Sequence, residues 1–237
     1  MKVNVSIIIP TLNEEKYLPS LLQSIRDQTA QPLEVIVADA NSIDQTKKIA
    51  LSFGCKIIQG GHLPKGRNNG AKIAKSDILL FLDADNILPG KFLERTVGEF
   101  QKRDLDIASC FAYVPFPTLM DITGEMLVNF YFKITEKIRP HVYGFCIFVK
   151  KKIHEEINGF DESIILGEDQ DYVLRASKKG VYRFLLSEKL PASMRRFREE
   201  GKIRTALKYS LIELHILLFG RIRKQIVPFE WGKHYKN

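Results

Sequence analysis

The chain has 237 residues, of which 45% are hydrophobic and 27% charged, so it can bury one substantial core and we expect one folded domain. Its formal net charge of +8 suits a partner that carries phosphate groups, an anionic membrane or nucleic acid, and does not choose among them. No apolar run approaches the ~20 residues that span a bilayer, and the first predicted strand begins by Val3 without a signal-peptide core. We therefore expect a soluble or peripheral cytoplasmic protein.

Strands and helices alternate through the first half of the chain. The β-branched run at 3–9 predicts a buried strand that ends at Pro10, and the apolar periodicity of 18–25 predicts a helix with Pro19 in its first turn. Further strands are predicted at 34–37, 55–59 and 78–82, and helices at 44–53 and 67–75, the second opened by a flexible basic loop. This alternation predicts an α/β fold with a mostly parallel sheet.

The second half continues with strands predicted at 105–114, 143–149 and 182–186 and with helices at 89–102, at 118–137 and after Gly167. The weakly helical segment at 118–137 carries Phe130, Tyr131 and Phe132. These aromatic side chains either cover the sheet or line an acceptor groove, and we expect them to cover the sheet.

A last helix begins near Ile203 and places apolar residues on one face, after which a basic cluster follows. The apolar face comprises Ala206, Leu207, Leu211, Leu214 and Leu218, and the cluster comprises Arg221, Arg223 and Lys224. We expect the face to pack on the sheet or on a second subunit. Because basic amphipathic helices also lie in membrane interfaces, peripheral membrane contact is the alternative.

Two carboxylates follow the most apolar strand of the chain. Ile78 to Leu82 lacks polar alternation, which is typical of a central strand covered on both faces. Asp83 and Asp85 come just after its carboxyl end, where open α/β sheets bind ligands. Carboxylate oxygens are hard ligands that suit Mg²⁺ or Mn²⁺, and an ordinary solvated turn is the alternative interpretation.

A second acidic group opens the helix after Gly167. Glu168, Asp169 and Asp171 crowd its first turn, where the helix dipole favours negative charge. The dipole accounts for one or two of these acids, and three exceed what capping requires.

Five strings occur in an order and spacing that resemble family 2 glycosyltransferases. They are S-I-I-I-P-T-L-N-E-E, V-I-V-A-D-A-N-S-I-D-Q-T, K-G-R-N-N-G, L-D-A-D, and N-G-F-D-E followed by G-E-D-Q-D, and they cover about residues 3–180. The resemblance implies the A-type glycosyltransferase fold, with a single-domain, mixed and mostly parallel central sheet flanked by helices. It also implies a nucleotide-diphosphate-sugar donor, a divalent metal and inversion at the anomeric carbon.

The resemblance assigns roles on the donor side. It places Pro10, Thr11, Asn13 and Glu14 around the nucleoside and Asp39 against the base. A carboxylate accepts the imide proton of uracil, which favours a UDP-sugar. Arg67, in the glycine-bearing loop, is expected to reach the nucleobase or the diphosphate, with a solvated loop arginine as the alternative.

The resemblance also assigns the metal and the chemistry. Asp85 is expected to bind Mn²⁺ or Mg²⁺ directly, and Asp83 to reach the ribose or a metal-bound water. Asp169 matches the base that takes a proton from the acceptor hydroxyl, and Glu168 and Asp171 become second-shell or acceptor-binding candidates.

The chain departs from the family pattern in two places. Ala40 and Asn41 replace an aspartate and a glycine, which leaves the nucleobase preference open. Where some members place an extra metal-binding histidine, this chain has S-M-R-R-F-R. Arg195 and Arg196 there either hold the diphosphate or an anionic acceptor, or are surface residues.

These assignments divide the chain into a nucleotide-sugar half at 1–114, an acceptor-side half at 115–200 and a C-terminal helix and tail at 201–237. The acceptor is expected to be a saccharide or a lipid-linked molecule. Alternatives are transfer to a polyprenyl phosphate and a non-catalytic nucleotide-sugar-binding protein. A nucleotidyltransferase would need a glycine-rich loop after the first strand, and no nucleic-acid-binding motif is found, so nucleic acid is not expected as a partner.

Overall fold

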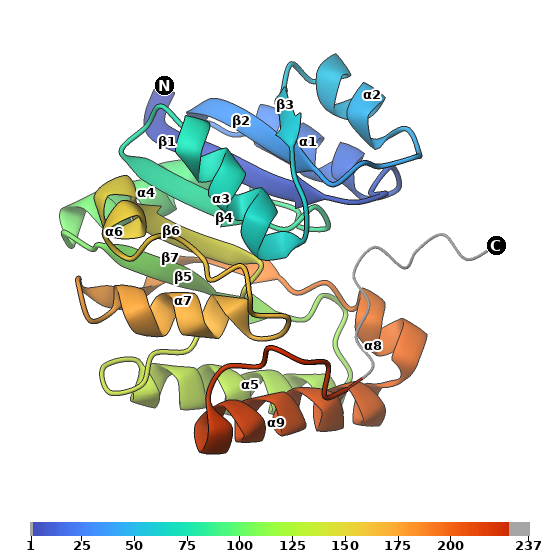
Figure 1. Ribbon diagram of the computed structural model, residues 1–237, viewed down its shortest axis with the longest axis vertical. Coiled ribbons are helices and arrows are strands. Elements are labelled where there is room, and N and C mark those ends of the chain that lie inside the picture. Colours follow the sequence, from blue (N-terminus) through green and yellow to red (C-terminus); the bar gives the residue numbers. More distant parts are fainter. Residues whose placement is uncertain (1, 228–237) are drawn as a thin grey trace.

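The computed structural model describes residues 2–227, which form a seven-stranded sheet with helices on both faces (Figure 1). The strand order is β3-β2-β1-β4-β6-β5-β7. Strands β1 to β4 run parallel, β6 is antiparallel to both of its neighbours, and β7 runs parallel to β5. This confirms the predicted mixed, mostly parallel sheet. The strands are β1 (Lys2–Thr11), β2 (Gln31–Asp39), β3 (Lys56–Gln59), β4 (Ile78–Leu82), β5 (Ile107–Tyr113), β6 (Cys146–Lys150) and β7 (Tyr182–Pro191).

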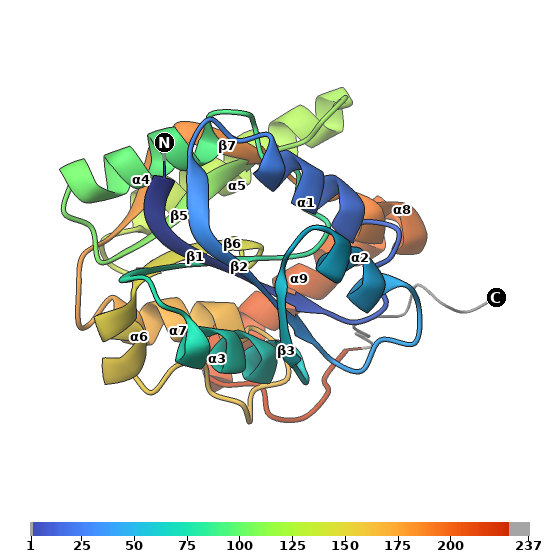
Figure 2. The ribbon, with the colours of Figure 1, turned by 90° about the horizontal axis from the view of Figure 1, so that it is seen from above.

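The helices form a layer on each face of the sheet, and two long helices lie apart from these layers (Figures 1 and 2). On one face lie α1 (Leu18–Arg26), α2 (Thr46–Ser52) and α4 (Phe92–Lys102). On the other lie α3 (Leu63–Ile73), α6 (Lys151–Glu156) and α7 (Glu168–Ala176). The remaining helices are α5 (Leu119–Thr135), the short α8 (Arg195–Glu200) and α9 (Lys202–Phe219). In Figure 1, α5 and α9 run along the lower edge.

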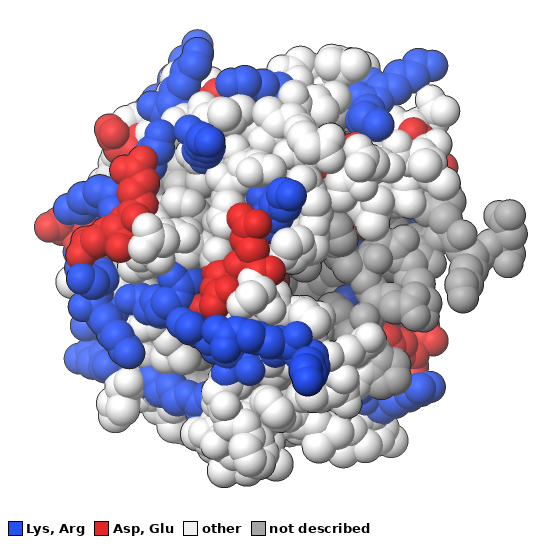
Figure 3. Space-filling view, in the orientation of Figure 1, with Lys and Arg blue, Asp and Glu red and all other residues white. Residues whose placement is uncertain are grey.

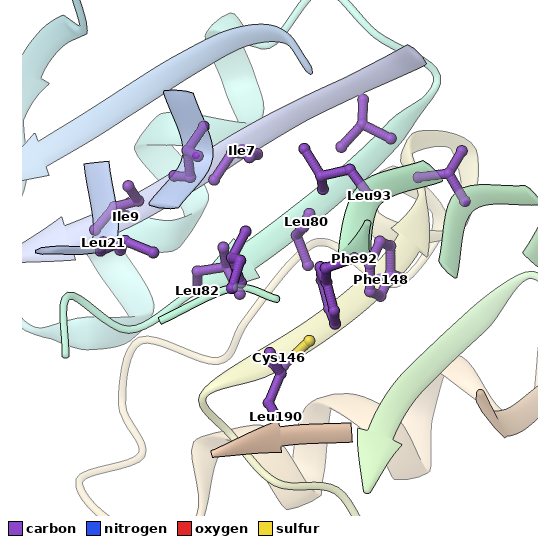
Figure 4. Packing of buried hydrophobic residues seen from close by; sticks show 14 of the residues in the cluster. Ile7, Ile9, Leu21, Leu80, Leu82, Phe92, Leu93, Cys146, Phe148 and Leu190 are labelled. Carbon is purple, nitrogen blue, oxygen red and sulfur yellow. The ribbon is translucent and has the colours of Figure 1, made fainter. Parts of the chain in front are cut away.

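The apolar strands have one hydrophobic cluster on each side. Ile7 and Ile9 of β1 and Leu80 of β4 point to the cluster that contains Phe92 and Phe148 (Figure 4). Alternate residues, such as Ile8 and Phe81, point to the opposite cluster beneath α3 and α7. Because successive side chains of a strand face opposite sides, a strand covered twice must be apolar throughout, as Ile78–Leu82 predicted.

A glycine brings α3 close to β1. A Cβ atom on Gly70 would lie 2.4 Å from a methyl carbon of Ile8, so a larger residue there would push the helix away from the sheet. This close packing places the middle of α3 beneath the ends of the central strands, where Arg67 lies.

Two predicted boundaries are wrong. Pro10 does not end the first strand, because β1 pairs with β2 through Pro10 and Thr11. A proline is tolerated there because β4 pairs with β1 only from Val5 to Ile8, so at Pro10 the strand has a neighbour on one side only. The basic loop before residue 67 is helical, since α3 begins at Leu63 with Pro64 in its first turn. Arg67 is therefore a helix residue and not a loop residue.

The predicted packing of the last helix on the sheet is also wrong. Only Thr205 and Ile212 of α9 are buried, and the residues of the predicted apolar face are exposed. Helix α5 has no buried residue; Phe132 packs partly on the core, but Phe130 is 65% exposed and Tyr131 is exposed too. No helix among residues 2–227 is long and apolar enough to cross a membrane. Packing on a second subunit and the division into halves stay predictions, and residues 228–237 of the predicted tail lie outside the described residues.

Candidate active site

Polar side chains from several elements meet at one edge of the sheet. Strands β1 and β2 end at Thr11 and Asp39, which are paired in register, and Asp83 follows the neighbouring β4. The N–H of Asp83 donates to the carbonyl of Phe145 (3.2 Å), which directly precedes the antiparallel β6. The carboxyl ends of the central strands and the segment before β6 thus form the floor of the site.

Asp39 is buried and organises the loops over this floor. Its Oδ2 accepts hydrogen bonds from the hydroxyls of Thr11 (3.1 Å) and Ser42 (2.5 Å), and its Oδ1 accepts from the N–H of Ser42 (2.9 Å). The Ser42 hydroxyl in turn accepts from the N–H of Asn13 (2.8 Å). The predicted nucleoside residues Pro10, Thr11, Asn13 and Asp39 therefore form one connected group, and Ser42, which sequence reasoning missed, links them.

Arg67 joins the two acidic groups. Its side chain is only 2% exposed, and its guanidinium donates to Asp83 (3.1 Å) and to Glu168 (3.0 Å). It also donates to the carbonyl of Gly144 (3.1 Å) and lies over the ring of Phe160 (5.2 Å to the centroid). Arg67 therefore holds the two acidic groups together, and its expected contact with the donor stays a prediction.

Asp169 lies against Gly144. A Cβ atom built on Gly144 would be 2.2 Å from Oδ2 of Asp169, so only glycine leaves room for the carboxylate. Oδ1 accepts a hydrogen bond from the N–H of Gln170 (2.8 Å). Burial, followed by repulsion from Glu168, raises the pKa of Asp169 to about 7 against the opposing effect of Arg67. A carboxyl group with this pKa can take and release a proton near neutral pH.

Arg195 lies beside the other carboxylates. Its Nη1 is 3.2 Å from Oε2 of the buried Glu14 and 3.8 Å from Oδ2 of Asp85, and its guanidinium stacks over the ring of Tyr17 (4.7 Å to the centroid). Burial raises the pKa of Glu14 to about 7, although Arg195 opposes the rise. Asp85, Glu14 and Arg195 are thus brought together, and Tyr17 is a further contact that sequence reasoning missed.

Two predicted acceptor-side residues face elsewhere. Asp171 accepts a hydrogen bond from Nε of Arg175 (2.7 Å), one turn further along α7. It also accepts one from Nε of Arg221 (2.6 Å), which ties α7 to the segment after α9. Residues two apart in a helix project on nearly opposite sides, so Asp171 points away from Asp169. Arg196 donates to the hydroxyl of Tyr209 (3.0 Å) on α9.

Asp83 and Asp85 fit a divalent cation whose remaining ligands come from a substrate. Burial raises the pKa of Asp83 to about 6, and the charge of Asp85 adds to the rise, although Arg67 opposes it. A raised pKa shows that the carboxylate has too little positive charge around it, which a bound cation would supply. Residues 2–227 contain no group of three or more His, Cys, Asp or Glu side chains that would hold a metal by themselves. Mg²⁺ commonly takes one or two carboxylates and completes its shell with phosphate and water, so two acids suffice.

Comparison with known proteins identifies the family. The model of glycosyl transferase family 2 matches residues 6–157, which is more than half of the chain. The chain belongs to glycosyl transferase family 2. The match spans the central strands and the acidic pair Asp83 and Asp85, and it confirms the resemblance to the family. It covers the first four of the five strings, whereas N-G-F-D-E and G-E-D-Q-D lie after residue 157.

The curated relatives that the chain matches are longer than it is. It is 30% identical to the minor teichoic acid biosynthesis protein GgaB of Bacillus subtilis over 83% of the chain and 23% of that protein. It is 26% identical to the uncharacterized glycosyltransferase EpsJ of the same organism over 78% of the chain and 59% of that protein. The chain therefore spans less than two thirds of either relative.

Solved structures show that the chain has the expected A-type fold. The mannosyltransferase PcManGT of Pyrobaculum calidifontis, in complex with GDP-Man and Mn²⁺, superposes with a TM-score of 0.69 at 18% identity, covering 92% of this chain and 65% of that one. TarS 1-349 of S. aureus, in complex with UDP-GlcNAc, gives a TM-score of 0.62 at 21% identity and covers 80% of this chain and 58% of that one.

Proposed function

We propose that the protein is a metal-dependent, inverting glycosyltransferase that moves a sugar from a nucleotide-diphosphate donor, with a UDP-sugar favoured, to a saccharide or lipid-linked acceptor. The observation that carries the proposal is the position of Arg67, whose hydrogen bonds to Asp83 and Glu168 join the acids after β4 to those opening α7. This contact supports a single site, at the carboxyl ends of the strands, that contains the candidate metal ligands and the candidate base Asp169.

The nucleoside is proposed to bind where Pro10, Thr11 and Asn13 meet Asp39. An ionised carboxylate offers about four acceptor positions, and Asp39 uses three of them on Thr11 and Ser42. The remaining position, beside Lys47 whose Nζ is 3.7 Å from Oδ1, is proposed to accept the imide N–H of uracil. Guanine presents two adjacent donors, N1–H and the 2-amino group, which one acceptor position cannot both receive, so this site is expected to prefer uridine nucleotides.

The diphosphate is proposed to lie between Asp85 and Arg195. Mn²⁺ or Mg²⁺ bound by Asp85, with Asp83 beside it, would neutralise the charge that grows on the leaving diphosphate. Arg195, which is 3.8 Å from Asp85, supplies a second positive charge, and its stacking on Tyr17 keeps the guanidinium in place. This favours the diphosphate role of Arg195 over that of a surface residue.

Asp169 is proposed to be the base. Its carboxylate removes the proton from an acceptor hydroxyl as that oxygen attacks the anomeric carbon from the side opposite the diphosphate, which inverts the configuration. A pKa of about 7 suits this role, because the group is substantially ionised at neutral pH and still basic enough to accept a proton. Glu168, held by Arg67, fixes the start of α7 and hence the position of Asp169.

A screen of nucleotide sugars tests the proposal. UDP-sugars with Mn²⁺ should raise the melting temperature more than GDP-sugars do, since a ligand at ~100 times its dissociation constant adds about 2.7 kcal/mol to the free energy of unfolding. Donor hydrolysis or transfer to an added acceptor should then follow. Stabilisation without any turnover would instead indicate a nucleotide-sugar-binding protein, and equal stabilisation with and without metal would contradict the metal site.

A further inference from the structure

Helices α5 and α9 expose an unusual amount of apolar surface. We call it the apolar ledge, meaning the exposed aliphatic and aromatic side chains of these two helices, among them Met126, Leu127, Phe130, Leu207, Leu211 and Leu218. Large contiguous apolar patches on a monomer mark a site of interaction with a protein or a membrane. We propose that the ledge docks the enzyme onto an anionic lipid surface, independently of which donor and acceptor the site uses.

The charges exposed with the ledge all have one sign. Within α5 and α9, every residue of which the structure describes, the exposed charged residues are Lys133, Lys202 and Arg204. An exposed face made of apolar and basic side chains is complementary to the acyl and anionic headgroup regions of a bilayer, and each basic group near such a surface contributes about 1 kcal/mol.

The acids of these helices are withdrawn from the exposed face by specific contacts. Asp121 accepts a hydrogen bond from Lys202 (2.7 Å). Glu125 accepts one from the N–H of Val114 (3.0 Å), and Glu213 pairs with Arg139 (3.2 Å). The negative charges are thus used to hold the helices in place and leave the face free of repulsion toward anionic lipid.

The same contacts tie α9 to the start of α5 and to the segment that follows α5. Lys202, at the start of α9, reaches Asp121 at the start of α5, and Glu213 of α9 reaches His141, which follows α5 (3.1 Å). His141 in turn stacks on Phe132 of α5 (5.1 Å between centroids). The two helices are therefore held on the same edge of the molecule and run in the same direction.

More basic residues border the ledge. Arg221, Arg223 and Lys224 follow α9 directly and are exposed, and of these Arg221 and Arg223 also pair with Asp161. In Figure 3 a band of Lys and Arg crosses the face above the lower edge, over the segment that follows α9, and the lower edge itself is mostly white. An apolar edge with a basic border is the arrangement expected of a protein that rests on a membrane with its positive side chains among the headgroups.

The sign of the charges argues against a second copy of the chain as the occupant. A two-fold symmetric interface places the same patch of each subunit against the other. Lys133 is neutralised by Glu136 (2.8 Å), but Arg204 would meet no exposed acid of α5 or α9 on the facing surface, and like charges across an interface are unfavourable. An anionic bilayer meets the same residues with opposite charge.

Docking at the ledge would set the orientation of the active site. Leu217, an exposed residue of α9, also lines a hollow together with Leu166 and Gly167, the residue that precedes Glu168. The ledge is therefore next to the N-terminus of α7, where Asp169 lies, and a docked enzyme holds the acceptor side of its site close to the lipid surface.

Vesicle sedimentation tests the proposal with the full 237-residue chain. Wild type should sediment with vesicles of mixed phosphatidylglycerol and phosphatidylcholine, bind less as salt rises, and bind phosphatidylcholine alone weakly. The double variant Leu127→Glu/Leu211→Glu should lower the partition coefficient at least about tenfold, since it removes two apolar groups and adds two negative charges. Leu51→Glu is the matched control, because Leu51 is 64% exposed on α2, away from the ledge, and should leave binding unchanged.

Three results would overturn the proposal. The first is wild type that stays in the supernatant with anionic vesicles at low salt, and the second is a ledge variant that sediments as well as wild type. The third is a dimer, seen by light scattering, that the ledge variant converts to a monomer, with no vesicle binding, which would make the ledge an interface between copies. Melting curves of all variants check the fold, and because the mutated positions are exposed we expect changes within about 0.5 kcal/mol.

Discussion

Replacing Gly144 by alanine should displace the proposed base, Asp169, and leave its carboxyl group in the sequence. The added Cβ would lie 2.2 Å from Oδ2 of Asp169, 2.9 Å from Cγ and 3.2 Å from Cβ. Because the carboxyl carbon is also too close, rotating the carboxylate about its own bond does not relieve the clash. The whole side chain of Asp169 must change its position, or the segment before β6 must move.

The expected effect is large on turnover and small on stability. A shift of ~1 Å in a reacting group costs roughly 10²-fold in rate. Crowding by one methyl group costs about 1–3 kcal/mol, and alanine returns about 0.4–1 kcal/mol by restricting the unfolded chain. Gly144→Ala should therefore lower kcat roughly a hundredfold and leave the domain folded, with donor binding retained because the nucleoside contacts of Asp39 are elsewhere.

Steady-state transfer assays and donor titrations would measure both quantities. Gly98→Ala is the matched control, since a Cβ there has no neighbour within 4 Å and the residue lies in the exposed part of α4. That variant should keep full activity and gain about 0.5–1 kcal/mol. A Gly144→Ala enzyme with wild-type kcat would refute the reasoning, because it would show that the position of Asp169 does not limit transfer.

Three further predictions follow from the site and the core. Asp169→Asn should lower transfer roughly 10² to 10⁴-fold with donor affinity kept. The wild-type rate should rise as pH increases through about 7, and the variant should not show this rise. An active variant would point to a phosphate acceptor, which ionises near pH ~6 without a base. Asp85→Ala should abolish the Mn²⁺-dependent part of donor stabilisation in melting experiments, and unchanged metal dependence would remove Asp85 from the metal site. Burial lowers the pKa of His154 to about 4 from 6.5, so its unfolded form binds the proton more readily; wild-type stability should fall as pH drops from about 6.5 toward 4, and urea midpoints of His154→Gln should fall less over that range.

The sheet and the strand ends at Asp39 and Leu82 were predictable from the sequence because they depend on local patterns, whereas the end of the first strand was not. The unbroken apolar run at Ile78–Leu82 required cover on both faces, and β4 is the central strand with both clusters against it. Asp39 and Asp83 were predicted at strand ends from their place in the chain alone. Parallel strands bring such ends to one edge whatever the details of packing.

Contacts between distant residues were not predictable in the same way. Arg67 is 101 residues from Glu168, and nothing in either string indicates that one guanidinium serves both acidic groups. Gly144 belongs to no recognised string, and its importance depends on the approach of Asp169 from a different element. Sequence patterns report the environment of a residue through its neighbours in the chain, whereas these contacts depend on how α3, α7 and β6 are placed.

The exposed ledge shows a related limit. The spacing of Leu207, Leu211, Leu214 and Leu218 indicates a helix with an apolar face, as α9 has. Periodicity does not say what covers that face, because an apolar stripe looks the same against a sheet, a subunit or a lipid surface. Burial in the folded chain distinguishes packing on the sheet from contact with a subunit or a lipid surface. The apolar face of α9 is exposed, so it does not pack on the sheet.

The charge balance of the site explains why a cation and two arginines belong to the same arrangement. Five acids influence one another there, Glu14, Asp83, Asp85, Glu168 and Asp169, against the two guanidinium groups of Arg67 and Arg195. Fully ionised, they leave an excess of three negative charges, which is why burial and mutual repulsion raise the pKa values of Glu14, Asp83 and Asp169. A nucleoside diphosphate would bring still more negative charge to this edge of the sheet. Its binding is therefore favourable only together with a cation that both the acids and the phosphates can share.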